Sequence, residues 1–168
     1  EDTTVEEIIE LSGTSKGSFY HYFDGKDALL STLSSLFDEK YEELTGLLTP
    51  EMTAMEQLLF LNRELFHMIE DSISLDLLAR LYSTQLTTNG EKHLLDHNRI
   101  YYKLLRKIIA KGQAEGQLSS RSNVNEMVKL YALCERALLY DWCLCAGEYA
   151  LTEYSAKVLP GFLSSFLP

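Results

Sequence analysis

Apolar residues recur at spacings of three and four along almost the whole chain, and this periodicity constrains the fold more than any other feature. The stretch after residue 26 shows it clearly, with Leu29, Leu33 and Leu36 on one side of a helix. No run of β-branched residues alternates with polar ones as in a half-buried strand. With 46% hydrophobic residues among 168, the chain is able to bury a core without disulfides or metal. The sequence therefore predicts an all-α fold.

Start and stop signals divide this pattern into separate helices. Proline is common in the first turn of a helix after a threonine cap, so Thr49 and Pro50 predict the start of one of them. We expect the longer helices at about residues 26–49, 50–69, 75–86, 91–114, 125–149 and 152–167. Pro160 is expected to kink or interrupt the last of these.

Two short helices are predicted before residue 26. Thr3 or Thr4 caps the first, and Gly13 ends it in the manner of a left-handed cap. Ser15 opens the second, in which Phe19 lies four residues before a second phenylalanine and shares its buried side. Only a few residues separate the two helices, as a helix-turn-helix requires.

The chain carries a formal net charge of −10. This charge excludes nonspecific coating of nucleic acid by the whole surface, so any DNA contact has to be local. The three cysteines, Cys134, Cys143 and Cys145, crowd one helical segment, which favours a reduced chain in the cytoplasm. The longest apolar stretch, residues 137–146, is interrupted by Asp141 and is too short to span a bilayer.

The first thirty residues resemble the TetR family of bacterial transcriptional regulators. The residues that match are Thr3, Thr4, Val5, Ile8, Gly13, Ser15, Lys16, Gly17, Ser18, Phe19, Tyr20, Tyr22, Phe23, Lys26, Leu29 and Leu30. A break at residues 112–116 before a hydrophobic penultimate helix is also similar to the family. The resemblance implies a three-helix DNA-binding head, a ligand-binding body of about six helices, and a homodimer. It further implies that the family's first helix precedes residue 1, so that DNA binding belongs to a longer chain.

On this resemblance we divide the chain into a head with its connecting helix, residues 1–45, and a ligand-binding and dimerisation domain, residues 46–168. A recognition helix needs donors for phosphates at its start and side chains that reach base edges along its exposed face. His21 is the expected base reader, and Gly17 allows close approach of the backbone. The full set of expected DNA contacts is Thr4, Lys16, Gly17, Ser18, Tyr20, His21, Tyr22 and Lys26.

A structural interpretation of the same residues stays open. In it, Tyr20 and Tyr22 complete a small core, and Lys16 is a solvated surface charge. Residues 1–26 hold six acidic residues and two lysines, a net charge of −4, so modest DNA affinity with a shallow salt dependence is expected.

The last two helices, about 122–149 and 152–167, have apolar residues around much of their circumference. Burial on more than one side is therefore expected, and we predict a homodimer formed through these two helices. The partners expected for such a dimer are double-stranded operator DNA and a small-molecule effector that is apolar or aromatic, with no membrane.

Aromatic residues are numerous enough in the body to line a pocket, although at helical spacing such residues also serve as ordinary core. Glu135 is either an anchor for a cationic or hydroxylated ligand or the partner of a charge across the dimer. The candidate pocket residues are Phe60, Phe66, Tyr82, Tyr101, Tyr102, Leu105, Tyr131, Cys134, Glu135, Leu138 and Trp142.

Catalytic and metal chemistry have little support in the sequence. His93 and His97 lie four apart, a spacing that is able to hold a metal on one helix face, but no third ligand is evident and solvated histidines are favoured. There is no serine elbow, phosphate loop or carboxylate pair in a recognisable frame. We expect no cofactor, no metal and no enzymatic activity.

The sequence thus favours a ligand-responsive repressor that binds a palindromic operator as a homodimer and is released by a small molecule. The alternative is a helical carrier or sensor of small molecules that does not act on DNA.

Overall fold

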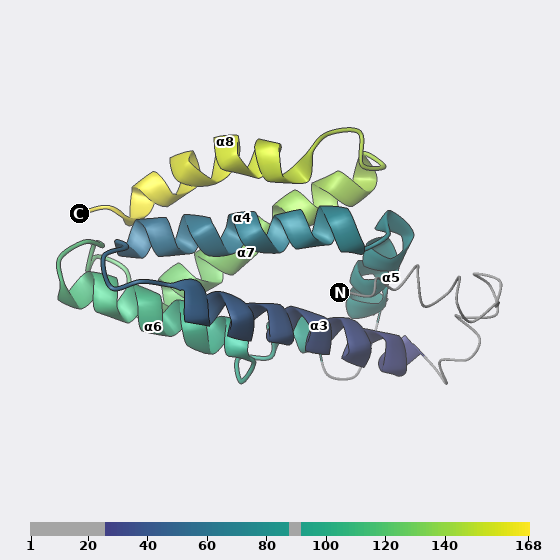
Figure 1. Cartoon of the computed structure of the whole chain (residues 1–168), viewed down its shortest axis with the longest axis horizontal. Coiled ribbons are helices and arrows are strands. Elements are labelled where there is room, and N and C mark those ends of the chain that lie inside the picture. The colour runs from purple at the N-terminus through teal and green to yellow at the C-terminus, as the bar shows by residue number, and fades with distance from the viewer. Residues whose placement is uncertain (1–25, 88–91) are drawn as a thin grey trace.

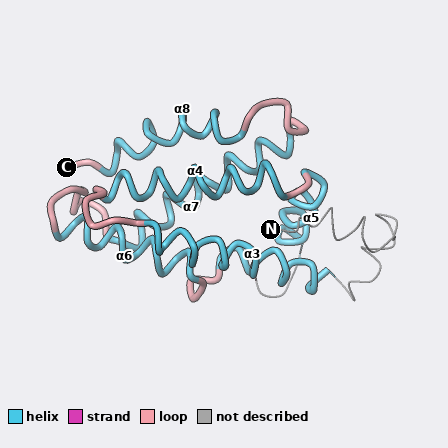
Figure 2. The backbone as a smooth tube through the Cα atoms, in the orientation of Figure 1, coloured by secondary structure: helices cyan, strands magenta, loops and turns pink. Residues whose placement is uncertain are grey.

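The computed structural model describes residues 26–87 and 92–168, which form six α-helices, two short 3₁₀ turns and no β-strand (Figures 1 and 2). The all-α prediction is confirmed. The helices are α3 (Lys26–Leu47), α4 (Ala54–Ser72), α5 (Leu75–Thr87), α6 (Ile100–Ala114), α7 (Val124–Leu144) and α8 (Leu151–Leu163), with the 3₁₀ turns η1 (His93–Leu95) and η2 (Ser164–Phe166). The helix-turn-helix expected before residue 26 lies outside the described residues, as do seven of the eight expected DNA contacts.

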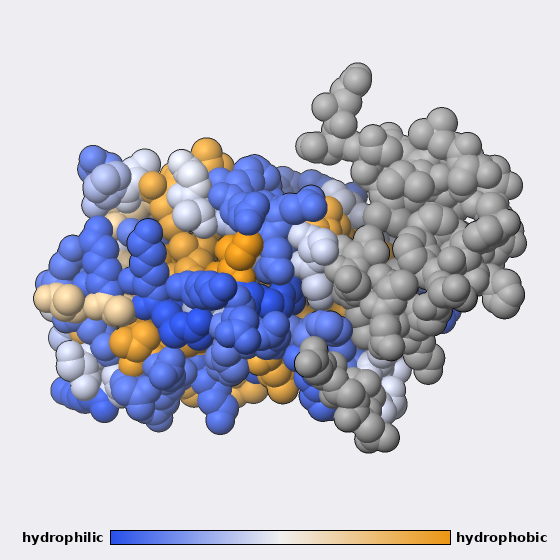
Figure 3. Space-filling view, turned by 90° about the horizontal axis from the view of Figure 1, so that it is seen from below, coloured by the Kyte–Doolittle hydropathy of each residue, from blue (hydrophilic) through white to orange (hydrophobic). Residues whose placement is uncertain are grey.

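Helix α4 is the centre of the bundle. It packs against α8 on one side and against α3 and α6 on the other, while α7 crosses behind it (Figure 1). Its buried side chains Leu58, Leu61 and Leu65 follow the three-and-four spacing of an amphipathic helix. Each leucine buried in this way contributes about 1.5 to 3 kcal/mol, so the seam along α4 supplies much of the core. The face formed by α3 and α6 is mainly hydrophilic with smaller apolar areas (Figure 3).

The start of α4 differs from the prediction. Pro50 lies in a turn closed by the amide of Met52, which donates to the carbonyl of Thr49 at 3.2 Å. Thr53 caps the helix instead, because its hydroxyl accepts from the amide of Glu56 while the Glu56 carboxylate accepts from the amide of Thr53 at 2.7 Å. These two reciprocal hydrogen bonds form a capping box. They satisfy backbone N–H donors that the proline turn would leave unpaired, so α4 begins after Thr53.

Two other predicted helices are shorter than expected. The helix predicted over residues 91–114 begins only at Ile100, because the Asp96 carboxylate accepts from the amide of Asn98 at 2.8 Å and forms a local turn that competes with helix. Helix α7 ends at Leu144 and not at residue 149. There the backbone turns through positive φ at residue 146 and at Gly147, whose amide donates to the carbonyl of Trp142 at 3.0 Å.

Helix α8 begins without a capping side chain of its own, because alanine occupies the cap position. Glu70, at the end of α4, takes this role: its carboxylate accepts from the amides of Leu151 at 2.5 Å and Thr152 at 2.9 Å, and from the Thr152 hydroxyl. The carboxylate also complements the positive end of the helix dipole. Pro160 does not end α8, which continues through it to Leu163.

Replacing Glu70 with glutamine is expected to lower the free energy of unfolding by about 1 to 2 kcal/mol, since a neutral amide offers one accepting oxygen to three donors. Denaturant unfolding at a fixed protein concentration measures this loss. Glu153→Gln is the matched control, because Glu153 is exposed in the first turn of the same helix. Equal losses in the two variants would contradict the capping role of Glu70.

Candidate functional site

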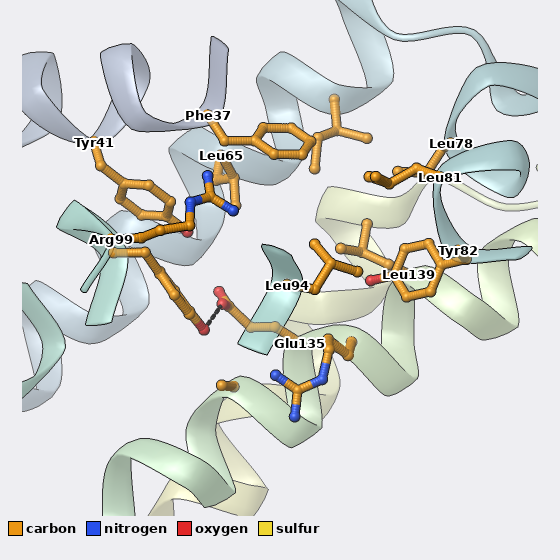
Figure 4. A pocket seen from close by; sticks show the side chains of 14 residues that line it. Phe37, Tyr41, Leu65, Leu78, Leu81, Tyr82, Leu94, Arg99, Glu135 and Leu139 are labelled. Carbon is orange, nitrogen blue, oxygen red and sulfur yellow. Dashed lines mark hydrogen bonds between the residues drawn. The ribbon is translucent and has the colours of Figure 1, made fainter. Parts of the chain in front are cut away.

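Five helices and the turn η1 line a small hollow in the body, here called the inner cavity (Figure 4). Its volume is about 70 Å³. The side chains that line it come from α3, α4, α5, η1, the residue before α6, α6 itself and α7: Phe37, Tyr41, Leu65, Ile69, Leu78, Leu81, Tyr82, Leu94, Arg99, Tyr101, Ala132, Glu135, Arg136 and Leu139. Most of these are apolar, and the charged groups are Arg99, Glu135 and Arg136.

Glu135 is the buried acid of this wall, with 4% of the residue exposed. Its Oε1 accepts from the Asn62 amide at 2.9 Å, and its Oε2 accepts from the Tyr101 hydroxyl at 2.7 Å (Figure 4 draws one hydrogen bond at Glu135 as a dashed line). Because the residue is buried among groups of its own chain, it does not pair with a charge across a dimer. Both oxygens act as acceptors, which suits an ionised carboxylate.

The hydrogen bonds continue beyond Glu135 into a chain that joins four helices. The Ser155 hydroxyl on α8 donates to Oδ1 of Asn62 on α4 at 2.5 Å, and the Asn62 amide donates to Glu135 on α7. Tyr101 on α6 donates to the same carboxylate. The cavity wall is therefore connected by polar contacts to α8 at the opposite side of α4.

Burial raises the pKa of Glu135 above its ordinary value of 4.5, and hydrogen bonds from Asn62, Tyr101 and Tyr131 offset part of that rise. Burial likewise raises the pKa of Tyr101 and Tyr41, so both phenols remain protonated donors at neutral pH.

A raised carboxyl pKa in the folded state predicts a pH dependence of stability. The folded chain holds the Glu135 proton more tightly than the unfolded chain does. The contribution of protonated Glu135 to the free energy of unfolding is therefore complete below pH 4.5 and is lost as pH rises through the pKa of the folded state. The free energy of unfolding of the wild type minus that of Glu135→Gln should therefore fall as pH increases above 4.5. Denaturant unfolding across this range tests the sign, and a difference that grows with pH would contradict it.

Arg99 connects the cavity wall to α3. Its Nε and Nη2 donate to the two Asp38 carboxylate oxygens at 3.2 and 3.0 Å, and Nη2 also donates to the carbonyl of Ser34 at 2.8 Å. The rings of Tyr41 and Tyr101 add a second contact, with centroids 5.1 Å apart. Helix α3 is thus held to the wall by a two-pronged ion pair and by a contact between two tilted aromatic rings.

A second hollow, here called the outer groove, lies beside the inner cavity and has a volume of about 410 Å³. Its lining is Tyr82, Gln85, Leu86, Lys92, Leu94, Leu95, Leu133, Arg136, Ala137 and Tyr140. Tyr82, Leu94 and Arg136 belong to both linings, so they form the partition between the two spaces.

Three of the eleven candidate pocket residues line the inner cavity, namely Tyr82, Tyr101 and Glu135. Phe60 lines a different groove, between α4 and α8. The other seven, Phe66, Tyr102, Leu105, Tyr131, Cys134, Leu138 and Trp142, are buried and line neither the inner cavity nor the outer groove. The structure adds Phe37 and Tyr41 from α3, together with the two arginines, which the sequence analysis did not select.

His93 and His97 do not share a helix face, because His93 lies in η1 and His97 lies in the following loop. The His97 ring packs on Tyr102 with centroids 4.5 Å apart. Across residues 26–87 and 92–168, no group of three histidine, cysteine or acidic side chains is placed to hold a metal ion. No helix in the same ranges has the length and apolar character needed to cross a bilayer.

Residues 1–33 match the family described as bacterial regulatory proteins, tetR family. No curated protein matches the sequence. Among solved structures, the chain is similar to the transcriptional regulator FadR from Bacillus subtilis, in complex with stearoyl-CoA, with 20% identity, a TM-score of 0.71, and coverage of 97% of this chain and 88% of that one. It is also similar to the fatty acid degradation regulator FadR from Bacillus halodurans, with 18% identity, a TM-score of 0.70 and the same coverage.

These structural likenesses establish the fold of the body, and the family match covers the segment that leads into α3. Residues 1–33 thus match the family of bacterial regulatory proteins described as tetR, and the body shares its fold with two solved transcriptional regulators.

Proposed function

We propose that this protein is a ligand-responsive transcriptional regulator of the TetR family, a homodimeric repressor that binds a palindromic operator and is released from it by a small molecule bound in the body. The DNA contacts in this proposal are Thr4, Lys16, Gly17, Ser18, Tyr20, His21, Tyr22 and Lys26. Residues 1–45 act as the head with its connecting helix, and residues 46–168 bind the effector and the second subunit. A protein with this task works in the cytoplasm.

The observation that carries the proposal is that α3 belongs both to the head and to the cavity. The family match, residues 1–33, includes the first turns of α3. Further along, the same helix contributes Phe37 and Tyr41 to the cavity wall and Asp38 to the ion pair with Arg99. A ligand that displaces this wall therefore acts directly on the helix that leads to the head.

Release from DNA requires the ligand to prefer a body conformation in which the two heads do not fit the operator. Tight binding alone is not sufficient, since equal affinity for both conformations shifts nothing. For this chain, the small inner cavity supports such a preference, because an effector of ordinary size has to enlarge a space of about 70 Å³.

Binding of the full-length protein to DNA from around its own gene is the decisive experiment, measured by fluorescence anisotropy at two salt concentrations. We expect sequence-preferring binding by a dimer, with a shallow salt dependence because few basic residues are available in the head. Random DNA of equal length and composition is the control. Binding no tighter than to random DNA, from a folded dimer and across a set of candidate promoters, would favour the carrier alternative.

Apolar side chains that remain exposed on the last two helices support the dimer. Leu133, Tyr140 and Leu144 on α7 are 47% to 66% exposed, and Tyr154 on α8 is 42% exposed. Side chains of this size at the surface of one subunit are typical of an interface. The dimer therefore uses α7 and α8 in this proposal.

Replacing Leu144 with glutamate is expected to weaken the dimer at least tenfold, because it places a charge at an interface that excludes water. Sedimentation equilibrium over a range of concentrations measures the dissociation constant. Leu47→Glu is the matched control, since Leu47 is an equally large side chain, 54% exposed, at the end of α3. If both variants dimerise like the wild type, the interface lies elsewhere.

The effector in this proposal has an apolar part. The apolar lining of the inner cavity supports this, and the similar FadR from Bacillus subtilis was solved with stearoyl-CoA, which has a long hydrocarbon chain. A ligand of this kind exchanges water for leucine and phenylalanine side chains.

A further inference from the structure

We propose that a buried chain of hydrogen bonds couples the inner cavity to helix α8, and through α8 to the association of the subunits. The chain runs from Ser155 through Asn62 to Glu135, where Tyr101 joins it. A shift of Tyr101 at the cavity wall then changes the position of α8, and association of the subunits acts on the wall in return. The inference rests on the proposed function, because it describes how the homodimer on α7 and α8 is regulated.

The direction of the bonds in this chain is fixed by the chemistry of its members. An ionised carboxylate only accepts hydrogen bonds, so Asn62 has to present an N–H group to Oε1 of Glu135. The oxygen of the same amide is then left for the Ser155 hydroxyl, which donates to it at 2.5 Å. Rotation of the amide by half a turn would place two acceptors against each other at Glu135. Asn62 therefore cannot change one of its bonds without changing the other.

The position of the chain prevents water from replacing its bonds readily. Glu135, Asn62 and Ser155 are all buried polar residues. A buried polar group that loses its partner destabilises the fold, so Asn62 follows a displaced carboxylate in preference to leaving its amide unpaired. The bonds that hold the three residues together at rest thus also transmit a displacement from α7 through α4 to α8.

Tyr101 is the member of the chain that responds to the cavity. Its hydroxyl donates to Oε2 of Glu135 at 2.7 Å, and both residues line the inner cavity. Its ring also contacts Tyr41 on α3, with centroids 5.1 Å apart. A molecule that enlarges a space of about 70 Å³ has to displace neighbouring side chains such as this one. The Glu135 carboxylate then loses a donor and takes a new position.

At the other end of the chain, α8 is attached to α4 by polar contacts at two separate points. Ser155 binds Asn62, and the Glu70 carboxylate accepts from the first two amides of α8. Only the first point leads to the cavity, since Glu70 is not part of the cavity lining. Ser155 directly follows Tyr154, an exposed residue of the proposed dimer face. The last bond of the chain therefore positions a segment that contacts the second subunit in the proposed dimer.

A double-mutant cycle on the dimer dissociation constant of the full-length protein tests the inference, measured by sedimentation equilibrium. Tyr101→Phe removes the bond at the cavity, and Ser155→Ala removes the bond at α8. Each variant should weaken the dimer about threefold to tenfold, because α8 is no longer held in the position that fits its partner. The double variant should be hardly weaker than either single variant, because a chain that is already broken transmits nothing further.

Glu70→Gln supplies the matched cycle. It also loosens α8 from α4, but outside the chain, so its effect on the dimer should add to that of Tyr101→Phe. Tyr102→Phe controls for the loss of a buried hydroxyl group on α6, since Tyr102 donates to the carbonyl of Leu94 and takes no part in the chain. This control should keep the dissociation constant within about a factor of two of the wild type.

Hydrogen exchange gives a second measurement that does not require a change in association. Wild type and variants are compared at a protein concentration at which they have the same association state. Amides of α8, residues 151–163, should exchange about threefold to tenfold faster in Tyr101→Phe than in the wild type. The same amides should exchange at the wild-type rate in Tyr102→Phe.

The possible results separate this inference from the proposed function. A dimeric wild type in which Tyr101→Phe changes neither the dissociation constant nor the exchange of α8 would overturn the inference alone. Additive effects of Tyr101→Phe and Ser155→Ala, or equal effects of Tyr101→Phe and Tyr102→Phe, would overturn it as well. A monomeric wild type would refute the homodimer and its regulation, whereas faster exchange of α8 in Tyr101→Phe would still support the coupling between cavity and helix.

Discussion

Replacing Gly112 with alanine is expected to lower the free energy of unfolding by about 3 kcal/mol. A Cβ at this position would lie 2.6 Å from the Cβ of Ala54 and 2.9 Å from Cδ1 of Leu118. Ala54 begins α4 and has no flexible side chain to move aside, so α4 and α6 would have to separate. Total stabilities of about 5 to 15 kcal/mol make such a loss severe.

Gly46→Ala is the control for this substitution. Gly46 lies in α3, and a Cβ there meets nothing within 4 Å. The same change should stabilise the protein by about 0.5 to 1 kcal/mol, because alanine restricts the unfolded chain. Denaturant unfolding of both variants measures the contrast, and a loss at Gly112 no larger than the change at Gly46 would show that α4 and α6 are loosely packed.

Replacing Asn62 with alanine should also cost about 3 kcal/mol, because it removes the central member of a buried hydrogen-bonded chain. The Glu135 carboxylate loses one of its donors, and the Ser155 hydroxyl loses its acceptor. Asn62 is 3% exposed and Ser155 is 1% exposed, so solvent does not readily replace these bonds. Thermal and denaturant unfolding both report the loss.

A double-mutant cycle with Glu135→Ala isolates the interaction from the effects of truncation. Residues within one buried network are expected to show a coupling energy of about 1 to 3 kcal/mol. Asn98→Ala is a suitable control, because Asn98 is an exposed asparagine outside the network. Additive losses for Asn62 and Glu135 would mean that the two residues contribute independently, contrary to the bonds between them.

The sequence was sufficient for the fold class and for most helices, since periodicity depends only on local spacing. Helix ends were harder, because competing caps such as Thr49 and Thr53 lie four residues apart and only geometry selects between them. Glu70 illustrates a further difficulty. It caps a helix about 80 positions later in the chain, and no local pattern reveals a contact at that separation.

The cavity was less predictable than the core for a physical reason. Periodicity identifies which side chains are buried, but not whether they face other side chains or an empty space. Phe66 and Tyr131 were selected as aromatic and prove to be fully buried core. The most useful signal was a polar residue in an apolar stripe, which singled out Glu135 and was also present at Asn62.

The single tryptophan of the chain, Trp142, has a practical consequence for optical work. Its indole N–H donates to the carbonyl of Tyr149 at 2.9 Å, so the ring is fixed at the turn between α7 and α8. It is 7% exposed and lines neither the inner cavity nor the outer groove. Intrinsic emission therefore acts as a remote reporter: a change in its intensity on titration of an effector would record motion passed along α7 and not quenching by the effector itself.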